Sequence, residues 1–108
     1  MLGKLEHVQV AGEASNVAEA IATIPRLHPD FVILDIQLPD GDGIAVLETI
    51  KRVGPRTVVA MLTNYADDYH RLRCEAAGAD FFLDKAKQFD EIPRILQELQ
   101  QARAERHG

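Results

Sequence analysis

The chain has 108 residues, the size of one compact domain, and this length excludes two full domains. Hydrophobic residues make up 46% and charged residues 27%, and the continuous apolar runs, such as residues 31–34 and 58–62, are far below the about 18 residues of a membrane span. A disordered chain and a membrane protein are therefore excluded. Twelve Lys and Arg against seventeen Asp and Glu give a net charge of −5, which repels phosphate backbones, so nucleic acid is not an expected partner.

The single cysteine, Cys74, cannot form an internal disulfide, and the sequence opens with no secretory signal pattern. We therefore expect a cytoplasmic protein. No repeat, low-complexity tract or linker divides the chain. We expect one domain over residues 1–108, with its core over about residues 8–99, a polar tail over residues 100–108 and no output domain after it.

The first half of the chain predicts two strands and two helices. Residues 8–11 alternate between apolar and polar, which is typical of a strand at a sheet edge. Asn16 is an N-cap candidate for a helix that we expect Pro25 to end. Residues 31–34 are continuously apolar, as in a central strand of a parallel sheet. Asp42 is the N-cap candidate of a second helix, which ends before a Gly-Pro pair.

The second half continues the alternation of strands and helices. Residues 57–62 predict a second central strand, and residues from about 66 to 77 predict a third helix. Residues 81–83 are a brief apolar run, which favours an edge strand. Residues 90–99 place apolar side chains on one face of a last helix.

This order of strands and helices predicts a parallel sheet with right-handed crossovers, the doubly wound α/β class. In such sheets ligands and chemistry collect at the carboxyl ends of the strands. Asp35 follows the strand at residues 31–34, Thr63 ends the next strand, and Lys85 follows the last one. We expect these three side chains to face one crevice.

An anion, a hydroxyl and an ammonium at one sheet edge fit phosphoryl transfer to a carboxylate. Asp35 is then the nucleophile that forms an acyl phosphate, Thr63 donates a hydrogen bond to a phosphoryl oxygen, and Lys85 supplies positive charge. Such a transfer also needs a divalent cation. Mg²⁺ prefers one or two carboxylates, a carbonyl, waters and the phosphate as oxygen ligands.

Three segments of the sequence resemble bacterial response regulator receiver domains, which are CheY-like and have a flavodoxin-like fold. They are the loop at residues 34–43, the pair at residues 62–63 and the segment at residues 77–85, in the right order and spacing. The resemblance implies the following roles for individual residues: phosphoacceptor and metal ligand for Asp35, switch hydroxyl for Thr63, phosphate-sensing lysine for Lys85, metal ligand through the backbone carbonyl for Gln37, and switch aromatic for Phe82.

The segment before residue 8 departs from this family. Receivers begin with a central strand that ends in a pair of acidic metal ligands, whereas residues 1–7 read as the tail of a helix. We therefore expect an N-terminally truncated receiver fold. Either residues 8–11 move directly beside residues 31–34, or a second copy fills the gap by strand exchange. Glu13 is then the candidate substitute for the acidic pair, and we expect the Mg²⁺ site to be incomplete.

The resemblance implies a phosphoacceptor signalling domain of a two-component phosphorelay rather than an enzyme. Its expected partners are a sensor histidine kinase or phosphotransfer protein and, through the third helix, the last strand and the last helix, a second copy of the chain. One alternative is a degenerate, metal-deficient receiver that acts only as a protein-interaction module. A small-molecule phosphatase with an aspartyl nucleophile is disfavoured, because such enzymes carry a second acid where this chain has Gln37.

Overall fold

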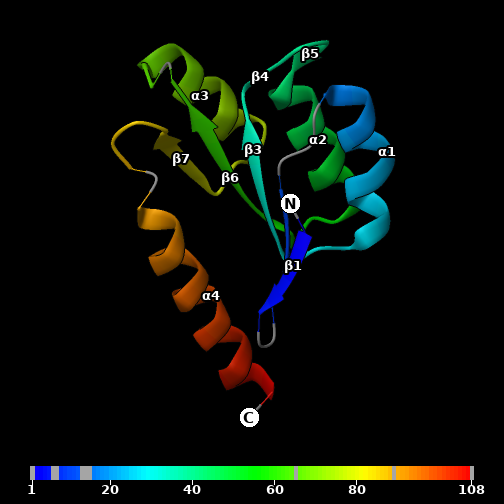
Figure 1. Cartoon of the computed structure of the whole chain (residues 1–108), viewed down its shortest axis with the longest axis vertical. Coiled ribbons are helices and arrows are strands. Elements are labelled where there is room, and N and C mark those ends of the chain that lie inside the picture. Colours follow the sequence, from blue (N-terminus) through cyan, green and yellow to red (C-terminus); the bar gives the residue numbers. More distant parts are fainter. Residues whose placement is uncertain (1, 6–7, 13–15, 65, 89, 108) are drawn as a thin grey trace.

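The computed structural model describes residues 2–5, 8–12, 16–64, 66–88 and 90–107 (Figure 1). Within these residues the main sheet contains β1 (Leu2–Leu5), β2 (Val8–Gly12), β3 (Phe31–Asp35), β6 (Val58–Thr63) and β7 (Phe81–Asp84). The helices are α1 (Val17–Leu27), α2 (Gly43–Val53), α3 (Asp68–Ala76) and α4 (Glu91–His107). A small separate hairpin consists of β4 (Gln37–Leu38) and β5 (Gly41–Asp42).

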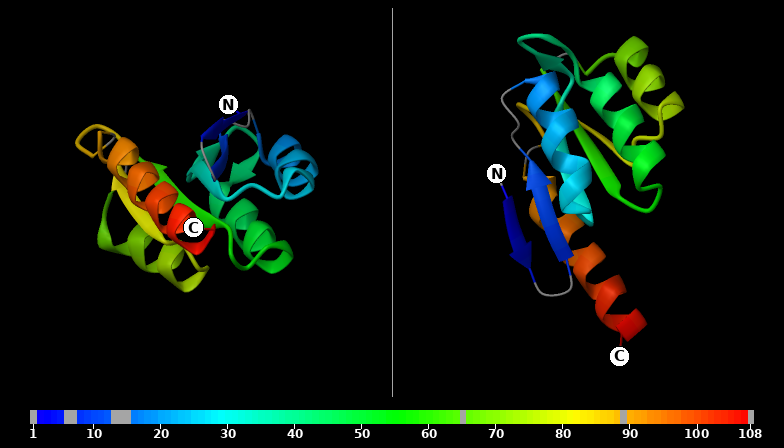
Figure 2. Two further views of the ribbon diagram at one scale, coloured as in Figure 1. Left: turned by 90° about the horizontal axis from the view of Figure 1, so that it is seen from below. Right: turned by 90° about the vertical axis from the view of Figure 1, so that its right-hand side faces the viewer.

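The strands of the main sheet follow the order β1-β2-β3-β6-β7. β2, β3, β6 and β7 are parallel, and β1 pairs antiparallel with β2. The three helices that connect successive parallel strands pack on one face, as right-handed crossovers between neighbouring strands require. Figure 2 shows α4 on the other face. The predicted α/β class, with a parallel sheet covered on both faces, is confirmed.

Two apolar clusters fill the space between these layers. The first joins the sheet to α1, α2 and α3, and the second joins it to α4. β3 contributes to both clusters, because Val32 and Leu34 face the first while Phe31 faces the second. This two-sided burial explains why the strand is continuously apolar, and it confirms β3 and β6 as the central strands.

The N-terminal segment differs from the helical tail expected there. Residues 2–5 form β1, which pairs with β2 in the register Leu2↔Ala11 to Leu5↔Val8. β2 is therefore not an edge strand, since β1 covers backbone groups that an edge would leave open. β2 does lie directly beside β3, with Val10 opposite Phe31, which is one of the two arrangements expected.

Two helix ends also differ from the expectation. α1 continues through Pro25 to Leu27 and ends at His28, which has a left-handed φ of 46°. The proline lies in the last turn, so the single helical hydrogen bond that its missing N–H removes is near the end of the helix, which stops two residues later. α4 continues beyond residue 99 to His107, because the polar residues that follow are strong helix formers. None of the helices in the described ranges is long and apolar enough to cross a membrane.

Candidate functional site

A pocket of about 130 Å³ opens at the carboxyl ends of β3 and β6. Its lining residues come from the ends of the two strands, from the loop after β3 and from the position after β7: Asp35, Ile36, Gln37, Leu62, Thr63, Asn64 and Lys85. The structure thus brings together four of the residues singled out in the sequence. Parallel strands present their carboxyl ends at one edge of a sheet, which is why residues far apart in the chain meet here.

The closest charged contact in this pocket joins Lys85 to Asp35. The Lys85 Nζ lies 3.4 Å from the Asp35 Oδ1. The two side chains are 43% and 42% exposed, so both remain accessible to a reactant. The backbone N–H of Lys85 donates to the carbonyl of Thr63 at 2.8 Å, which holds the start of the lysine segment against β6. Because exposed ion pairs contribute little to stability, this pair matters for the placement of charge rather than for folding.

Thr63 and Phe82 lie on the same face of the sheet. Thr63 is only 3% exposed, and it stands two residues after Met61, which is in register with Phe82. Phe82 is half-buried against the cluster formed with α1, α2 and α3. Phe82 does not line the pocket.

The loop after Asp35 returns tightly to the backbone of that residue. The N–H of Ile36 donates to the carbonyl of Leu62 at 3.2 Å, and the N–H of Gly43 donates to the carbonyl of Ile36 at 2.6 Å. A Cβ on Gly43 would lie 1.9 Å from the carbonyl oxygen of Asp35. Only glycine allows this approach. Between these anchors the hairpin pairs Gln37 with Asp42 and so places Gln37 at the pocket.

The two carboxylates of this loop cap helices. Asp40 accepts hydrogen bonds from the N–H groups of Val17, at 2.6 Å, and Ala18, at 3.2 Å, at the start of α1. The bond from Val17 favours the ionised form and lowers the pKa of Asp40. Asp42 caps α2 by accepting from the N–H of Ile44 at 2.8 Å, as its position in the sequence predicts.

Asp42 also ties the loop to α3. Its Oδ2 accepts a hydrogen bond from Arg73 at 3.0 Å, and this bond raises the pKa of the Arg73 guanidinium. Sequence reasoning missed this contact and that of Asp40, because the partners lie 31 and 23 residues away along the chain. No local pattern marks such pairs.

Cys74, next to Arg73, is fully buried, and burial raises its pKa to about 11, so the thiol is inert at neutral pH.

The metal ligands expected at the pocket are present only in part. Asp35 offers one carboxylate, and Gln37 lines the same pocket. Asp40 and Asp42 are occupied by helix caps, and the described ranges contain no group of three His, Cys, Asp or Glu that could hold a metal ion. Glu13, the expected substitute, lies outside the described residues. Mg²⁺ can be held by one or two carboxylates completed by water and phosphate, and Asp35 and Gln37 carry oxygen atoms of the kind that such a site uses.

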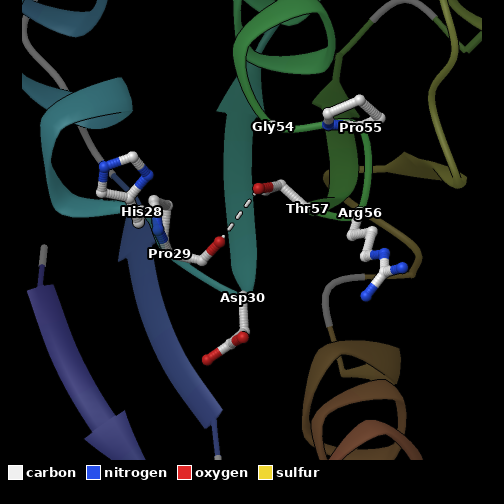
Figure 3. A pocket seen from close by; sticks show the side chains of 7 residues that line it. All are labelled: His28, Pro29, Asp30, Gly54, Pro55, Arg56 and Thr57. Atoms are coloured by element: carbon white, nitrogen blue, oxygen red, sulfur yellow. Dashed lines mark hydrogen bonds between the residues drawn. The ribbon is translucent and has the colours of Figure 1, made fainter.

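A larger pocket, of about 360 Å³, lies at the opposite edge of the sheet. It is lined by the loops that precede β3 and β6: His28, Pro29, Asp30, Gly54, Pro55, Arg56 and Thr57. The Thr57 hydroxyl donates to the carbonyl of Pro29 at 3.0 Å and ties the two loops together. In Figure 3 the side chains of His28, Asp30 and Arg56 extend in different directions, so they do not converge on a common ligand. We assign the chemistry to the smaller pocket.

Sequence comparisons relate the chain to one family over most of its length. The family described as "Response regulator receiver domain" matches residues 1–97. The "DNA-binding transcriptional activator DevR/DosR" of Mycobacterium tuberculosis is 34% identical over 99 residues, which are 92% of this chain and 46% of that protein. The chain spans less than half the length of the curated relatives that it matches first.

Solved structures show the same likeness in the fold. The "BeF3 Activated DrrB Receiver Domain" is 31% identical with a TM-score of 0.62, over 66% of this chain and 61% of that one. The "response regulator receiver domain protein (CheY-like)" of Methanospirillum hungatei JF-1 is 28% identical with a TM-score of 0.71, over 86% of this chain and 74% of that one. The likeness therefore includes both the sequence and the fold.

Proposed function

The chain belongs to the response regulator receiver domains of two-component systems, and we propose that it accepts a phosphoryl group on Asp35. Receiver domains are signalling domains that interact with histidine kinases or phosphotransfer proteins. Either protein would supply the phosphoryl group from a phosphohistidine. The observation that carries this proposal is the Lys85 ammonium 3.4 Å from the Asp35 carboxylate, in a pocket also lined by Thr63. In this proposal residues 1–108 act as one domain with its core over about residues 8–99.

The proposed reaction is an in-line displacement at phosphorus. An oxygen of Asp35 forms a bond to phosphorus while the bond to the histidine nitrogen breaks, and the electron pair of that bond stays on the imidazole. The Lys85 ammonium balances negative charge on the phosphoryl oxygens, and the Thr63 hydroxyl donates a hydrogen bond to one of them. Receiver domains bind Mg²⁺ as a family, and bound Mg²⁺ supplies further positive charge. Its proposed ligands here are Asp35, the carbonyl of Gln37 and, as a candidate third, Glu13.

The proposed signal is a change on the surface formed by α3, β7 and α4. A phosphoryl group at Asp35 draws Thr63 toward the pocket, and Phe82, on the same face of the sheet, turns into the space that Thr63 leaves. On α3, Tyr69 is 65% exposed and Leu72 is 61% exposed. Two large exposed apolar side chains and a net charge of −5 support a protein partner, or a second copy of the chain, rather than nucleic acid.

A second candidate function is a protein-interaction module that takes no phosphate. The partial metal site favours this candidate. Among the described residues, Asp35 is the one carboxylate that lines the pocket, so no second carboxylate is described there to hold Mg²⁺. Such a module would use the same α3 surface in a single state. The two candidates differ in whether Asp35 can be phosphorylated.

Incubation with a small phosphodonor and Mg²⁺, followed by intact-mass measurement and peptide mapping, separates the two candidates. We expect one phosphoryl group, on Asp35, and none on the Asp35→Asn variant. Asp68→Asn is the matched control, because Asp68 is an exposed acid on α3 that pairs with Arg71 away from the pocket. Equal labelling of Asp35→Asn would refute the site, and an unlabelled chain that still binds its partner would favour the second candidate.

A further inference from the structure

We propose that Asp40 is a positioning residue for phosphoryl transfer to Asp35. By binding the start of α1, it holds the β4–β5 hairpin in place and so keeps Gln37 at the pocket. This inference rests on the proposed function. Asp40 touches neither the pocket nor a reacting atom, and its effect on the reaction is transmitted through the backbone of the loop.

The hairpin is too short to keep its own shape. Each of its strands has two residues, with Gln37 opposite Asp42 and Leu38 opposite Gly41. Isolated two-stranded hairpins are marginally stable at best, so this hairpin depends on contacts outside itself. Its base is held by the backbone bonds of Ile36 and Gly43. The tip has its anchor at Asp40, whose carboxylate binds the Val17 and Ala18 N–H groups.

The contact between the hairpin and α1 goes beyond ordinary helix capping. α1 already has its own N-cap, because the Asn16 Oδ1 accepts from the N–H of Glu19 at 2.7 Å. Asp40 reaches two different N–H groups from another part of the chain. Next to it the hairpin packs closely on the helix, since a Cβ on Gly41 would lie 3.3 Å from Val17 Cγ2. The hydrogen bonds and the packing both fix the tip of the loop to the same end of α1.

Loss of this anchor would free the tip and leave the loop held at its base and by Asp42, which caps α2 and binds Arg73. Gln37 lies two residues after Asp35, on the strand that leads from this base to the tip, so we expect release of the tip to loosen the position of Gln37 at the pocket. Reactions of this kind depend on groups held within about 1 Å of the productive geometry. Asp40 is ionised at neutral pH, as aspartates ordinarily are, and the hydrogen bond from Val17 lowers its pKa further, so its carboxylate can accept the N–H groups of α1 under the conditions of the reaction.

The structure offers a matched pair of variants to test this. Asp40→Ala and Asn16→Ala each remove a side-chain acceptor from the start of α1, and only the first releases the hairpin. The readouts are the rate at which the small phosphodonor labels Asp35 and the hydrogen exchange of the backbone amides at residues 36–42. We expect Asp40→Ala to label about tenfold more slowly and to exchange these amides faster. Asn16→Ala should match the wild type in both, although the stability of both variants falls.

Asp40→Asn is the conservative variant, and it serves if Asp40→Ala fails to fold. It keeps one carbonyl oxygen for the N–H groups of α1, so we expect it to recover part of the lost rate. Equal slowing by Asp40→Ala and Asn16→Ala would overturn the inference, because helix stability would then explain the effect. Wild-type labelling by Asp40→Ala would also overturn it. If the wild type takes no phosphate the proposed function fails, and amide exchange still decides whether Asp40 holds the hairpin.

Discussion

The close approach of Gly43 to the backbone of Asp35 gives a sharp test of the site. In Gly43→Ala the new Cβ would lie 1.9 Å from the Asp35 carbonyl oxygen, where at least 3.0 Å is required. The backbone must therefore move by about 1.1 Å, and the 2.6 Å hydrogen bond from the Gly43 N–H to the Ile36 carbonyl must lengthen or break. Overpacking of this kind costs about 1–3 kcal/mol of folding stability. A shift of about 1 Å next to a nucleophile can slow a reaction by about 100-fold.

Urea unfolding and the labelling rate of Asp35 measure these two effects separately. Gly54→Ala is the matched control, because its Cβ would meet the Thr57 Oγ1 at 3.1 Å at the opposite edge of the sheet. We expect the control to label at the wild-type rate, whatever small stability it loses. If Gly43→Ala were as stable as the wild type and labelled as fast, the tight loop described here would not position Asp35.

Three further predictions follow from the charges and exposure of named residues. Lys85→Ala should keep the fold but lower the labelling rate of Asp35 by about 100-fold, which is the usual effect of removing one group that stabilises developing charge. An unchanged rate in the same mass assay would contradict the role of Lys85. Folding lowers the pKa of Asp40 below 3.8, its ordinary value in an unfolded chain. The ionised Asp40 therefore stabilises the fold at pH values above 3.8, and this stabilisation is lost as the pH falls through the pKa of Asp40 in the folded protein. The thermal midpoint of the wild type should therefore fall more than that of Asp40→Asn on acidification from pH 5 to pH 3, and parallel curves would contradict this. Cys74, with a pKa raised to about 11, should react with a thiol reagent at pH 8 only as fast as the chain unfolds, and fast labelling of the folded protein would show that it is accessible.

Much of this fold follows from local patterns in the sequence. Continuous apolar runs identify β3 and β6 as central strands, because a strand buried on both faces needs apolar residues at every position. The sequence around Asn16 and Asp42 predicts both as helix caps, since a cap binds an N–H two or three residues away. The order of strands also predicts that Asp35, Thr63 and Lys85 meet, because parallel strands bring their carboxyl ends to one edge of the sheet.

The contacts that hold the loop around Asp35 depend on the packing of whole elements. Asp40 binds α1 and Arg73 binds Asp42 only because the three crossover helices lie side by side on one face of the sheet. β1 likewise becomes a strand because β2 offers it backbone partners, although its own residues predicted a helix. An Asp at a turn reads the same in the sequence whether it points to solvent or to a helix 22 or 23 residues away. Such pairings depend on the distance in space between elements, and hydrophobic burial of the sheet and helices sets that distance.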